Sequence, residues 1–337
     1  MQKRILVVRT DRVGDVVMIT PMIRELRRTF PGAFIATLTN PNSADVLLNN
    51  PHLDDILIDE PGKKSFMNVV SDLRNRRFTD GLLLMPTKRA AYQMFLSGIR
   101  NRIGVGRKPY EVITFMKSVS RNKYIPLRYE ADYCMDLARA IGVVSDDLTP
   151  EIFVTDDERV RGMELLKNSG SILKRKRIII HTGSGRSSPN WSEDKYLELV
   201  ESLLKQTSDS EIILTAREMS EEYIERSKQA GGERVVDARK PVKRLRDMIQ
   251  IIANADFLIA ASTGPLHIAS ALGRRTVGLY CHNKVNCTKL WGALGRNSVN
   301  LEVSKEYCDA NCSADKEVCS FENGIGVEEV IREIMRD

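Results

Sequence analysis

Hydrophobic and polar positions alternate along this chain with two different periods. Short hydrophobic runs rich in β-branched residues are followed by longer segments in which hydrophobic residues recur at the spacing of an amphipathic helix. This order is typical of βαβ units, in which helices cover both faces of a parallel sheet. In the first half it predicts strands at 4–8, 34–38, 55–58 and 81–84, and helices at 21–29, 41–49 and 66–76.

The same alternation returns in the second half, after a weaker middle. Glycines and prolines interrupt residues 101–128, which we interpret as loops, and a helix is expected at 131–141. Further on, the pattern predicts strands at 177–181, 211–214, 234–236, 257–260 and 276–280, and helices at 192–205, 219–230, 242–253 and 265–272. We therefore expect an α/β protein with two Rossmann-like, doubly wound parallel-sheet domains at 1–155 and 174–337, joined by a connector at 156–173.

Composition places the chain among ordinary globular proteins. Its 337 residues suffice for two domains, and 42% hydrophobic and 28% charged residues argue against a disordered or fibrous chain. Hydrophobic runs stay well short of the ~20 residues of a membrane span, and the N-terminus lacks a signal-peptide pattern, so we expect a cytoplasmic protein. The net charge of +6 suggests an anionic partner. Because the basic residues lack the aromatic interleaving or zinc spacing of common nucleic-acid modules, we expect no nucleic acid as that partner.

A cluster of charge follows the first predicted strand. The stretch "RTDRVGD" places Arg9, Arg12 and Asp15 around Gly14. The dinucleotide fingerprint G-x-G-x-x-G is absent, and the negative charge of Asp15 would repel a pyrophosphate beside it. A carboxylate here suits a general base or an acceptor for a hydroxyl group, and the alternative interpretation is a helix cap.

Two more polar loops follow strands of the second half, where open parallel sheets bind their ligands. In "AASTGPLHIASALG", a strand passes into a helix whose free N–H groups and positive dipole end suit a phosphate, although a plain capped helix would look the same. The candidate residues of this turn are Ser262, Thr263, Gly264, Pro265, Leu266 and His267. The glycine-rich "HTGSGRSSPNW" offers neutral and cationic donors for a second wall of the anion site, with a flexible surface turn as the alternative. Its candidates are Thr182, Gly183, Ser184, Arg186, Ser187 and Asn190.

These motifs resemble glycosyltransferase family 9, the ADP-heptose:lipopolysaccharide heptosyltransferase type. The resemblance rests on "ILVVRTDRVGDVVMITPMIRELRRTFPGAFI", "IHTGSGRSSPNWSEDKYLELV" and "ANADFLIAASTGPLHIASALGRRTVGLY", which stand in the family's order and separation. It implies a GT-B architecture, with an acceptor lobe and a nucleotide-sugar lobe facing a central cleft. It also implies an inverting enzyme that needs neither metal nor cofactor. The donor would be ADP-heptose or a related nucleotide sugar, and the acceptor an anionic, lipid-linked lipopolysaccharide core.

The resemblance also assigns residues. The family's catalytic aspartate falls on Asp15, and its diphosphate-binding loop falls on residues 262–267. Arg9 and Arg12 flank Asp15 and, with Gly14 and Lys88, are candidates for contact with the acceptor. The alternatives are a solvated surface for the two arginines and a helix start for Lys88. Contact with a lipid-linked acceptor would bring the protein peripherally to the cytoplasmic face of the inner membrane. Better-known heptosyltransferases often carry an aspartate where Ser262 stands, and a lysine before the tryptophan of the second motif. Arg186 is our candidate for that missing positive charge.

Other residues and other functions stay open. Cys281, Cys287, Cys308, Cys312 and Cys319 lack the paired C-x-x-C of a zinc site, so we interpret them as reduced structural thiols. The histidines best placed for function are His181 and His267, whereas His52 and His282 have no partner recognisable in the sequence. A nucleotide-sugar epimerase or dehydrogenase, a family member with another donor and a non-catalytic glycan-binding protein are the alternatives to a heptosyltransferase.

Overall fold

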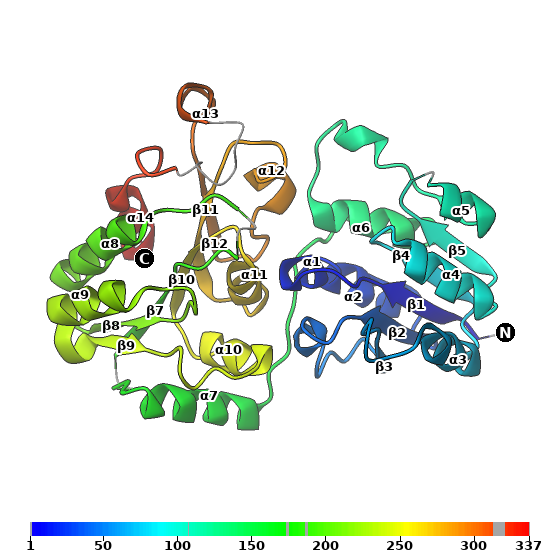
Figure 1. Cartoon of the computed structure of the whole chain (residues 1–337), viewed down its shortest axis with the longest axis horizontal. Helices are drawn as coiled ribbons and strands as arrows, with labels where there is room; N and C mark the ends of the chain where they lie inside the picture. Colours follow the sequence, from blue (N-terminus) through cyan, green and yellow to red (C-terminus); the bar gives the residue numbers. More distant parts are fainter. Residues whose placement is uncertain (1, 107, 173–174, 186–187, 313–320, 337) are drawn as a thin grey trace. The chain divides into compact units, whose positions relative to one another are not determined.

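The computed structural model describes residues 2–106, 108–172, 175–185, 188–312 and 321–336. The chain divides into two compact units, Met1–Phe153 and Val154–Asp337. Each unit contains a six-stranded parallel sheet with helices on both faces (Figure 1). The first unit ends two residues before the predicted boundary at 155, and the second begins before the predicted connector.

The sheet of the first unit has the strand order β3-β2-β1-β4-β5-β6. This is the 3-2-1-4-5-6 order of a doubly wound Rossmann sheet, so the predicted fold class is confirmed for this unit. Its strands are β1 (Arg4–Val8), β2 (Phe34–Thr39), β3 (Asp55–Ile58), β4 (Asp80–Leu83), β5 (Asn101–Gly104) and β6 (Lys117–Ser118). Its α-helices are α1 (Val13–Val17), α2 (Thr20–Thr29), α3 (Phe66–Arg76), α4 (Lys88–Leu96), α5 (Pro109–Ile113) and α6 (Glu130–Arg139), with 3₁₀ turns η1 (Ala44–Val46) and η2 (Asn122–Tyr124).

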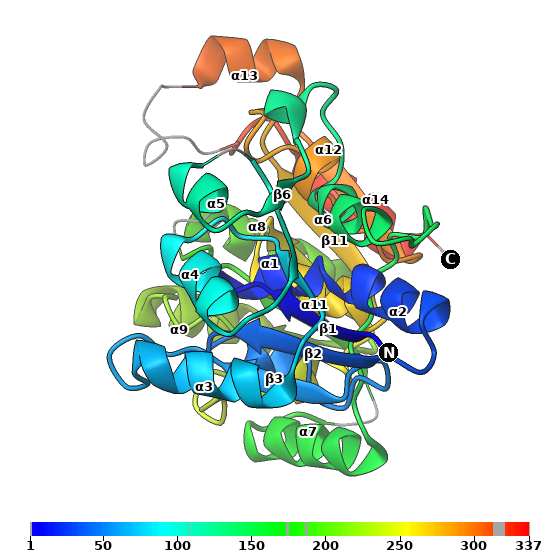
Figure 2. The ribbon, with the colours of Figure 1, turned by 90° about the vertical axis from the view of Figure 1, so that its right-hand side faces the viewer.

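Helices cover the two faces of this sheet in pairs. Helices α3 and α4 pack together on one face, and α2 and α6 pack together on the other (Figure 2). Strand β1 lies in the middle of the sheet, and its residues Ile5, Leu6, Val7 and Val8 are fully buried. A hydrophobic run without alternation is what a central strand covered on both faces requires.

The second unit repeats the same topology. Its sheet runs in the order β12-β11-β10-β7-β8-β9, which again is 3-2-1-4-5-6 when counted within the unit. Its strands are β7 (Lys176–His181), β8 (Ser210–Leu214), β9 (Val235–Asp237), β10 (Phe257–Ala261), β11 (Arg275–Tyr280) and β12 (Ser298–Glu302). Its α-helices are α7 (Asp156–Asn168), α8 (Glu193–Gln206), α9 (Glu221–Gly231), α10 (Leu245–Ile252), α11 (Gly264–Ala271), α12 (Thr288–Trp291), α13 (Lys305–Asn311) and α14 (Val327–Met335), with a 3₁₀ turn η3 (Gly232–Arg234).

One hydrophobic core lies under α8, α9 and α14. Tyr196 and Val200 of α8 pack there with Ile180 of β7 and Ile331 of α14. Helices α7, α10 and α11 pack together on the other face. The final helix α14 therefore completes the cover of a sheet whose first strand lies about 150 residues earlier. No element was predicted beyond residue 280, so β12, α12, α13 and α14 were missed.

The predicted helix at 41–49 is wrong. Only the single 3₁₀ turn Ala44–Val46 forms there. The side chain of Asn40 accepts hydrogen bonds from the backbone N–H groups of Asn42 and Ser43, at 2.8 and 3.1 Å. These side-chain bonds compete with the backbone hydrogen bonds of a helix, which is why Asn favours turns.

The predicted loops at 101–128 contain two strands and a short helix. Strand β5 pairs with β4 in the register Leu82↔Ile103, and β6 pairs with β5. Gly104, one of the glycines in this range, ends β5, and a Cβ there would meet the Glu111 carboxylate at 2.8 Å. Close approach by a neighbouring element, rather than a turn, explains this glycine.

The predicted connector at 156–173 is largely the helix α7, which belongs to the second unit. Thr155 and Glu158 form a capping box at its start, with the Thr155 hydroxyl accepting from the Glu158 N–H at 3.3 Å. The Glu158 carboxylate also pairs with buried Arg246 of α10 at 2.6 Å, which holds the pKa of Glu158 at about 2. The acidic residues Asp156, Asp157 and Glu158 of the predicted connector thus form the first turn of a packed helix.

Candidate functional site

The two sheets place their polar loops at equivalent positions. In each sheet the strand order reverses next to the first strand, between β1 and β4 in one unit and between β7 and β10 in the other. Ligands of doubly wound folds bind beyond the carboxyl ends of the strands at such a switch point. All three loops chosen from the sequence leave β1, β7 or β10, so they lie at the two switch points.

In the first unit, Asp15 is held by an arginine at the end of β1. The guanidinium of Arg9 donates a hydrogen bond from Nη2 to Asp15 Oδ1. Asp15 lies in the first turn of α1, and its side chain retains 16% of its exposure. The carboxylate is therefore fixed at one oxygen and still reachable by solvent, as a general base requires.

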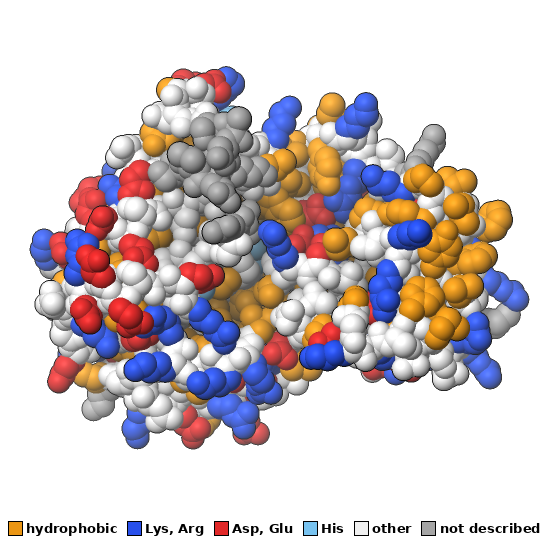
Figure 3. Space-filling model, viewed as in Figure 1, with side chains coloured by type: hydrophobic (Ala, Val, Ile, Leu, Met, Phe, Trp, Pro, Cys, Tyr) orange, Lys and Arg blue, Asp and Glu red, His pale blue; other side chains and the backbone are white. Residues whose placement is uncertain are grey.

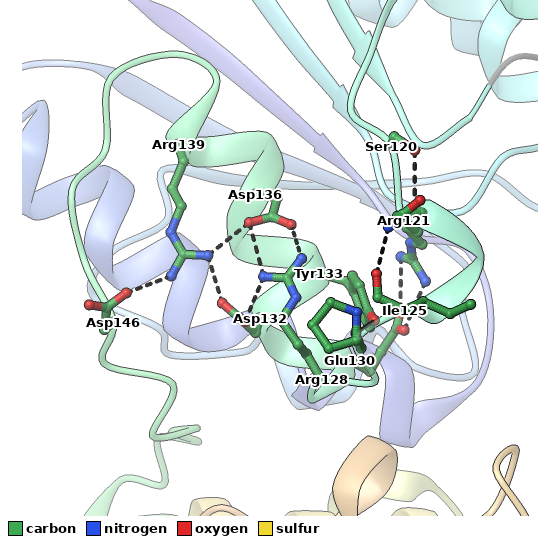
Figure 4. A network of polar contacts seen from close by, with 12 residues as sticks. Ser120, Arg121, Ile125, Arg128, Glu130, Asp132, Tyr133, Asp136, Arg139 and Asp146 are labelled. Atoms are coloured by element: carbon green, nitrogen blue, oxygen red, sulfur yellow. Dashed lines mark hydrogen bonds and ion pairs between the residues drawn. The ribbon is translucent and has the colours of Figure 1, made fainter.

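The same guanidinium binds two further carboxylates. Arg9 Nε donates to Asp11 Oδ1, and Arg9 Nη1 donates to Glu130 Oε1 of α6, both at 2.8 Å. Burial raises the pKa of Asp11 to about 6, although the charge of Arg9 acts in the opposite direction. Glu130 also accepts from Arg121 at 2.8 and 3.0 Å, which Figure 4 shows beside α6. Alternating charges thus run from Asp15 through Arg9 and Glu130 to Arg121.

This network changes the role expected for Arg9. Its side chain is only 4% exposed, and its N–H groups already meet three carboxylates and the thiol of Cys134. The geometry favours positioning of Asp15 over contact with an acceptor. Arg12 and Lys88 are exposed, whereas Gly14 is half-buried in α1. Lys88 opens α4 after β4, so it comes from the same switch point as Asp15.

In the second unit, β10 passes into α11 through Ser262 and the N-cap residue Thr263. The side chains of Thr263 and His267 are buried, with exposed fractions of 6% and 3%. Among the residues that the structure describes, neither Thr263 Oγ1 nor His267 Nδ1 meets a hydrogen-bond partner. Buried polar atoms are almost always paired, so these two atoms at the start of a helix suit a polar ligand.

The two buried histidines of this unit are uncharged at neutral pH. Burial lowers the pKa of His267 to about 4, and it lowers the pKa of His181 to the same value. His181 ends β7 beside Ala260 of β10, and its Nδ1 lies 2.9 Å from the hydroxyl of Thr215. Each ring can therefore act as a neutral donor or acceptor rather than as a cation.

The loop after β7 is partly a structural turn. Asn190 donates from Nδ2 to the carbonyl of Thr182, and its Oδ1 accepts from the Tyr196 hydroxyl at 2.7 Å. Asn190 therefore closes the loop through both ends of its amide. At Gly183 a Cβ would meet the Glu218 carboxylate at 2.4 Å, so this glycine permits a close approach. Ser184 is half-buried, while Arg186 and Ser187 lie outside the described residues.

Sequence reasoning missed the partners that come from distant segments. Glu130 bonds to Arg9 across 121 positions, and Thr215 lies beside His181 across 34 positions. Arg121 in turn bonds to Glu130, and no local motif marks these three residues. Glu218 was missed too, although it follows a strand end like the chosen loops. The one available signal was its position in the loop that leaves β8, four residues after that strand ends.

The remaining histidines and cysteines have structural surroundings. His52 Nε2 lies 3.0 Å from a Glu151 oxygen, and His282 Nδ1 lies 2.8 Å from a Glu302 oxygen. The described cysteines are free thiols, and burial raises the pKa of Cys308 to about 12. Cys319 lies outside the described residues. Within the described ranges, no group of three or more metal-ligating side chains is placed to hold an ion, and no helix is long and apolar enough to cross a membrane.

Comparison with known families decides the assignment. The sequence profile of glycosyltransferase family 9 (heptosyltransferase) matches residues 67–319, about three-quarters of the chain. The chain belongs to glycosyltransferase family 9. The match covers both loops of the second unit and begins after Asp15. The family 9 assignment makes the protein a glycosyltransferase of the heptosyltransferase type.

Individual relatives agree with this assignment. A Haemophilus influenzae protein provisionally named a glycosyltransferase is 27% identical over 311 residues, covering 90% of this chain and 88% of its own. The crystal structure of a family 9 glycosyltransferase from Veillonella parvula superposes with a TM-score of 0.80 at 18% identity, covering 98% and 95% of the two chains. The Escherichia coli ADP-heptose lipopolysaccharide heptosyltransferase II gives 0.77 at 19% identity, covering 99% and 97%. These structures confirm the two-unit fold of this family 9 transferase.

Proposed function

We propose that this transferase moves a heptose from ADP-heptose to a hydroxyl group of an anionic, lipid-linked lipopolysaccharide core, with inversion at the anomeric carbon. Membership of family 9 supports the reaction class. The donor and acceptor are proposed from the similarity to Escherichia coli heptosyltransferase II, whose name states both. The observation that carries the mechanism is the Asp15 carboxylate, fixed by Arg9 at the switch point of the first sheet.

Asp15 acts as the general base in this proposal. The proton of the acceptor hydroxyl moves to the Asp15 carboxylate while the hydroxyl oxygen forms a bond with the anomeric carbon. The bond between that carbon and the diphosphate oxygen breaks, and its electrons leave with the diphosphate. Because Arg9 engages Oδ1, we assign Oδ2 to the acceptor proton. Exposed Arg12 and Lys88 supply positive charge for the anionic acceptor.

The turn between β10 and α11 binds the diphosphate. Within the described residues, the buried Thr263 hydroxyl and the buried His267 Nδ1 have no hydrogen-bond partner, and the first turn of α11 adds backbone N–H groups. These groups stabilise the negative charge that develops on the leaving diphosphate. We propose that they replace a metal ion, so chelation by EDTA should leave turnover unchanged.

Nucleotide titration and turnover test the proposal together. Calorimetric titration with ADP, GDP, UDP and NAD identifies the nucleotide, and the matching sugar nucleotide is then assayed with a lipopolysaccharide core acceptor. Two variants form a matched pair, since Asp15→Asn and Asp11→Asn each remove one carboxylate from the same Arg9 guanidinium. Only Asp15→Asn removes the proposed base.

The expected result is selective ADP binding that both variants retain. Asp15→Asn should lower kcat by about 10²–10⁴, the typical contribution of a general base, while Asp11→Asn keeps most of it. Preference for another nucleotide would replace the proposed donor. If Asp11→Asn is the inactive variant and Asp15→Asn turns over normally, the base is misassigned. If the wild type binds ADP but shows no turnover, the protein is a non-catalytic binder.

A further inference from the structure

The end of α4 and the region of α5 expose a group of large hydrophobic side chains. Helices α4 and α5 pack together, and the Phe95 and Phe115 rings lie 6.3 Å apart between centroids. We call this group the α4–α5 patch. Its members are 36–76% exposed: Phe95, Leu96, Val112, Ile113 and Phe115. Figure 3 shows hydrophobic side chains gathered over this part of the first unit, with Lys and Arg side chains beside them.

Phe115 is the most exposed member and is held in a strained conformation. Its side chain is 76% exposed, and its φ of 52° lies in the left-handed region that bulky residues avoid. The next residue, Met116, packs against the hydrophobic core instead. The fold therefore accepts both an unfavourable backbone conformation and an exposed aromatic ring at one position. Strain of this kind concentrates at functional surfaces.

The patch lies in the most basic segment of the chain. Residues 84–129 contain ten Lys and Arg but a single acidic residue, Glu111. Glu111 is buried, where its Oε2 accepts a hydrogen bond from the Lys108 N–H at 3.0 Å. Arg89, Arg121 and Arg128 pair with carboxylates from outside the segment, so, within the described residues, the remaining basic residues carry its unpaired positive charge. Among the basic residues around the patch, Arg100, Lys108 and Lys117 are exposed.

We infer that the α4–α5 patch docks the protein onto an anionic lipid bilayer, with its hydrophobic side chains entering the interface and the surrounding Lys and Arg contacting lipid headgroups. Exposed hydrophobic groups rimmed by positive charge are the two signals that hold peripheral proteins at such surfaces. A second copy of the chain fits less well. A two-fold interface would bring the same patch from each copy together, and its positive charges would repel.

This inference adds a location to the proposed function, since a lipid-linked acceptor lies at a membrane, but it does not depend on the reaction. Vesicles without any glycan acceptor test the surface alone. A negative result there would leave the proposed transfer reaction untouched, and failure of that reaction would leave the vesicle result valid.

The test is co-sedimentation of the full chain with vesicles. One set contains phosphatidylcholine alone, and the other includes about 30% phosphatidylglycerol, whose negative charge attracts basic residues. We expect binding to the anionic set that weakens as salt is added. Ile113→Asp with Phe115→Asp should reduce that binding by about tenfold or more, because it removes apolar insertion and adds negative charge. Asp tolerates left-handed backbone better than Phe, so position 115 should fold normally.

Matched controls separate this surface from general effects. Val144→Asp changes a side chain that is 96% exposed but lies beyond α6, on the opposite face of the sheet. A second patch variant combines Arg100→Glu with Lys117→Glu. Its control combines Lys167→Glu with Lys205→Glu, which reverses two exposed charges in the second unit. We expect the two patch variants to lose vesicle binding and the two controls to keep it.

Three results would overturn the inference. The wild type would bind both vesicle sets equally or not at all, or the patch variants would sediment as the wild type does. The third result is a dimer of the wild type, seen by light scattering, that becomes a monomer in the double variant Ile113→Asp with Phe115→Asp. That result would make the patch an interface between copies.

Discussion

The guanidinium of Arg9 lies 2.8 Å from the carboxylate of Glu130, a residue 121 positions further along the chain. Both side chains are only 4% exposed, so the pair lies where water screens charge poorly. Glu130 comes from α6 and Arg9 from the end of β1. The pair therefore joins a helix to the strand whose end positions Asp15, and it links the stability of this unit to its site.

Replacing Glu130 tests that link. Glu130→Gln removes a charge that faces both Arg9 and Arg121, so we expect a loss of about 3 kcal/mol in the free energy of unfolding, measured in urea. The control is Asp146→Asn, which breaks the exposed pair with Arg139 shown in Figure 4 and should cost less than about 1 kcal/mol. Equal losses of unfolding free energy in the two variants would mean that the buried pair with Arg9 stabilises the protein no more than the exposed pair does.

Thr263→Val should separate folding from binding. The buried Thr263 hydroxyl has no partner within the described residues, so replacing it with an isosteric methyl group should leave the unfolding free energy unchanged or raise it. If the hydroxyl donates to the diphosphate, ADP binding should weaken about tenfold. Calorimetry with ADP and a urea titration measure the two quantities. A variant that is destabilised and binds ADP normally would assign the hydroxyl to the fold.

Lowering the pH should destabilise the second unit through its buried histidines. His181 and His267 have pKa values of about 4 in the folded protein, below the ordinary 6.5. Between those values the unfolded chain binds protons that the folded chain does not, so stability falls as pH decreases, by about 1.4 kcal/mol per pH unit for each histidine. Asp11 acts in the opposite direction, because its folded pKa of about 6 exceeds its ordinary value. Its contribution to stability is present at low pH and is lost as pH rises through about 6.

The measurement compares the wild type with His267→Gln across pH 4.5 to 7, which cancels the groups that both proteins share. We expect the variant to lose less stability than the wild type as the pH falls. Parallel pH profiles would show that the His267 ring titrates normally in the fold.

Gly162→Ala should loosen α7 from α10. A Cβ at Gly162 would lie 2.3 Å from the backbone carbonyl oxygen of Gln250, and backbone cannot move aside as a side chain can. We expect a loss of about 1–3 kcal/mol in unfolding free energy. Gly32→Ala is the control, because its Cβ would meet nothing within 4 Å. A loss confined to Gly162→Ala would show that α7 is an integral part of the second unit; equal stability would mean that the helix shifts freely.

Local patterns predicted the elements where propensity and burial agree. Strand β1 and helix α3 match their predicted bounds, because a hydrophobic run between turns suits a central strand and Ser65 caps the helix start. Predictions failed where neighbours decide the outcome. Strand β5 forms by pairing with the edge of β4, and α7 is stabilised by packing against α10. For the site, the sequence located the loops at both switch points, because polar residues after buried strands mark those loops.

The sequence by itself determined the α/β class, the two-unit order and the three loops, since all of these depend on the period of hydrophobic residues and on short motifs. Tertiary structure alone decided what those loop residues contact. Arg9 is a buried partner of Asp15, and Asn190 donates a hydrogen bond to the carbonyl of Thr182 within its own loop. The physical reason is that a charged or amide side chain takes its role from the partners that folding brings to it. For Arg9 that partner is Glu130, and for Asn190 it is Tyr196 of α8.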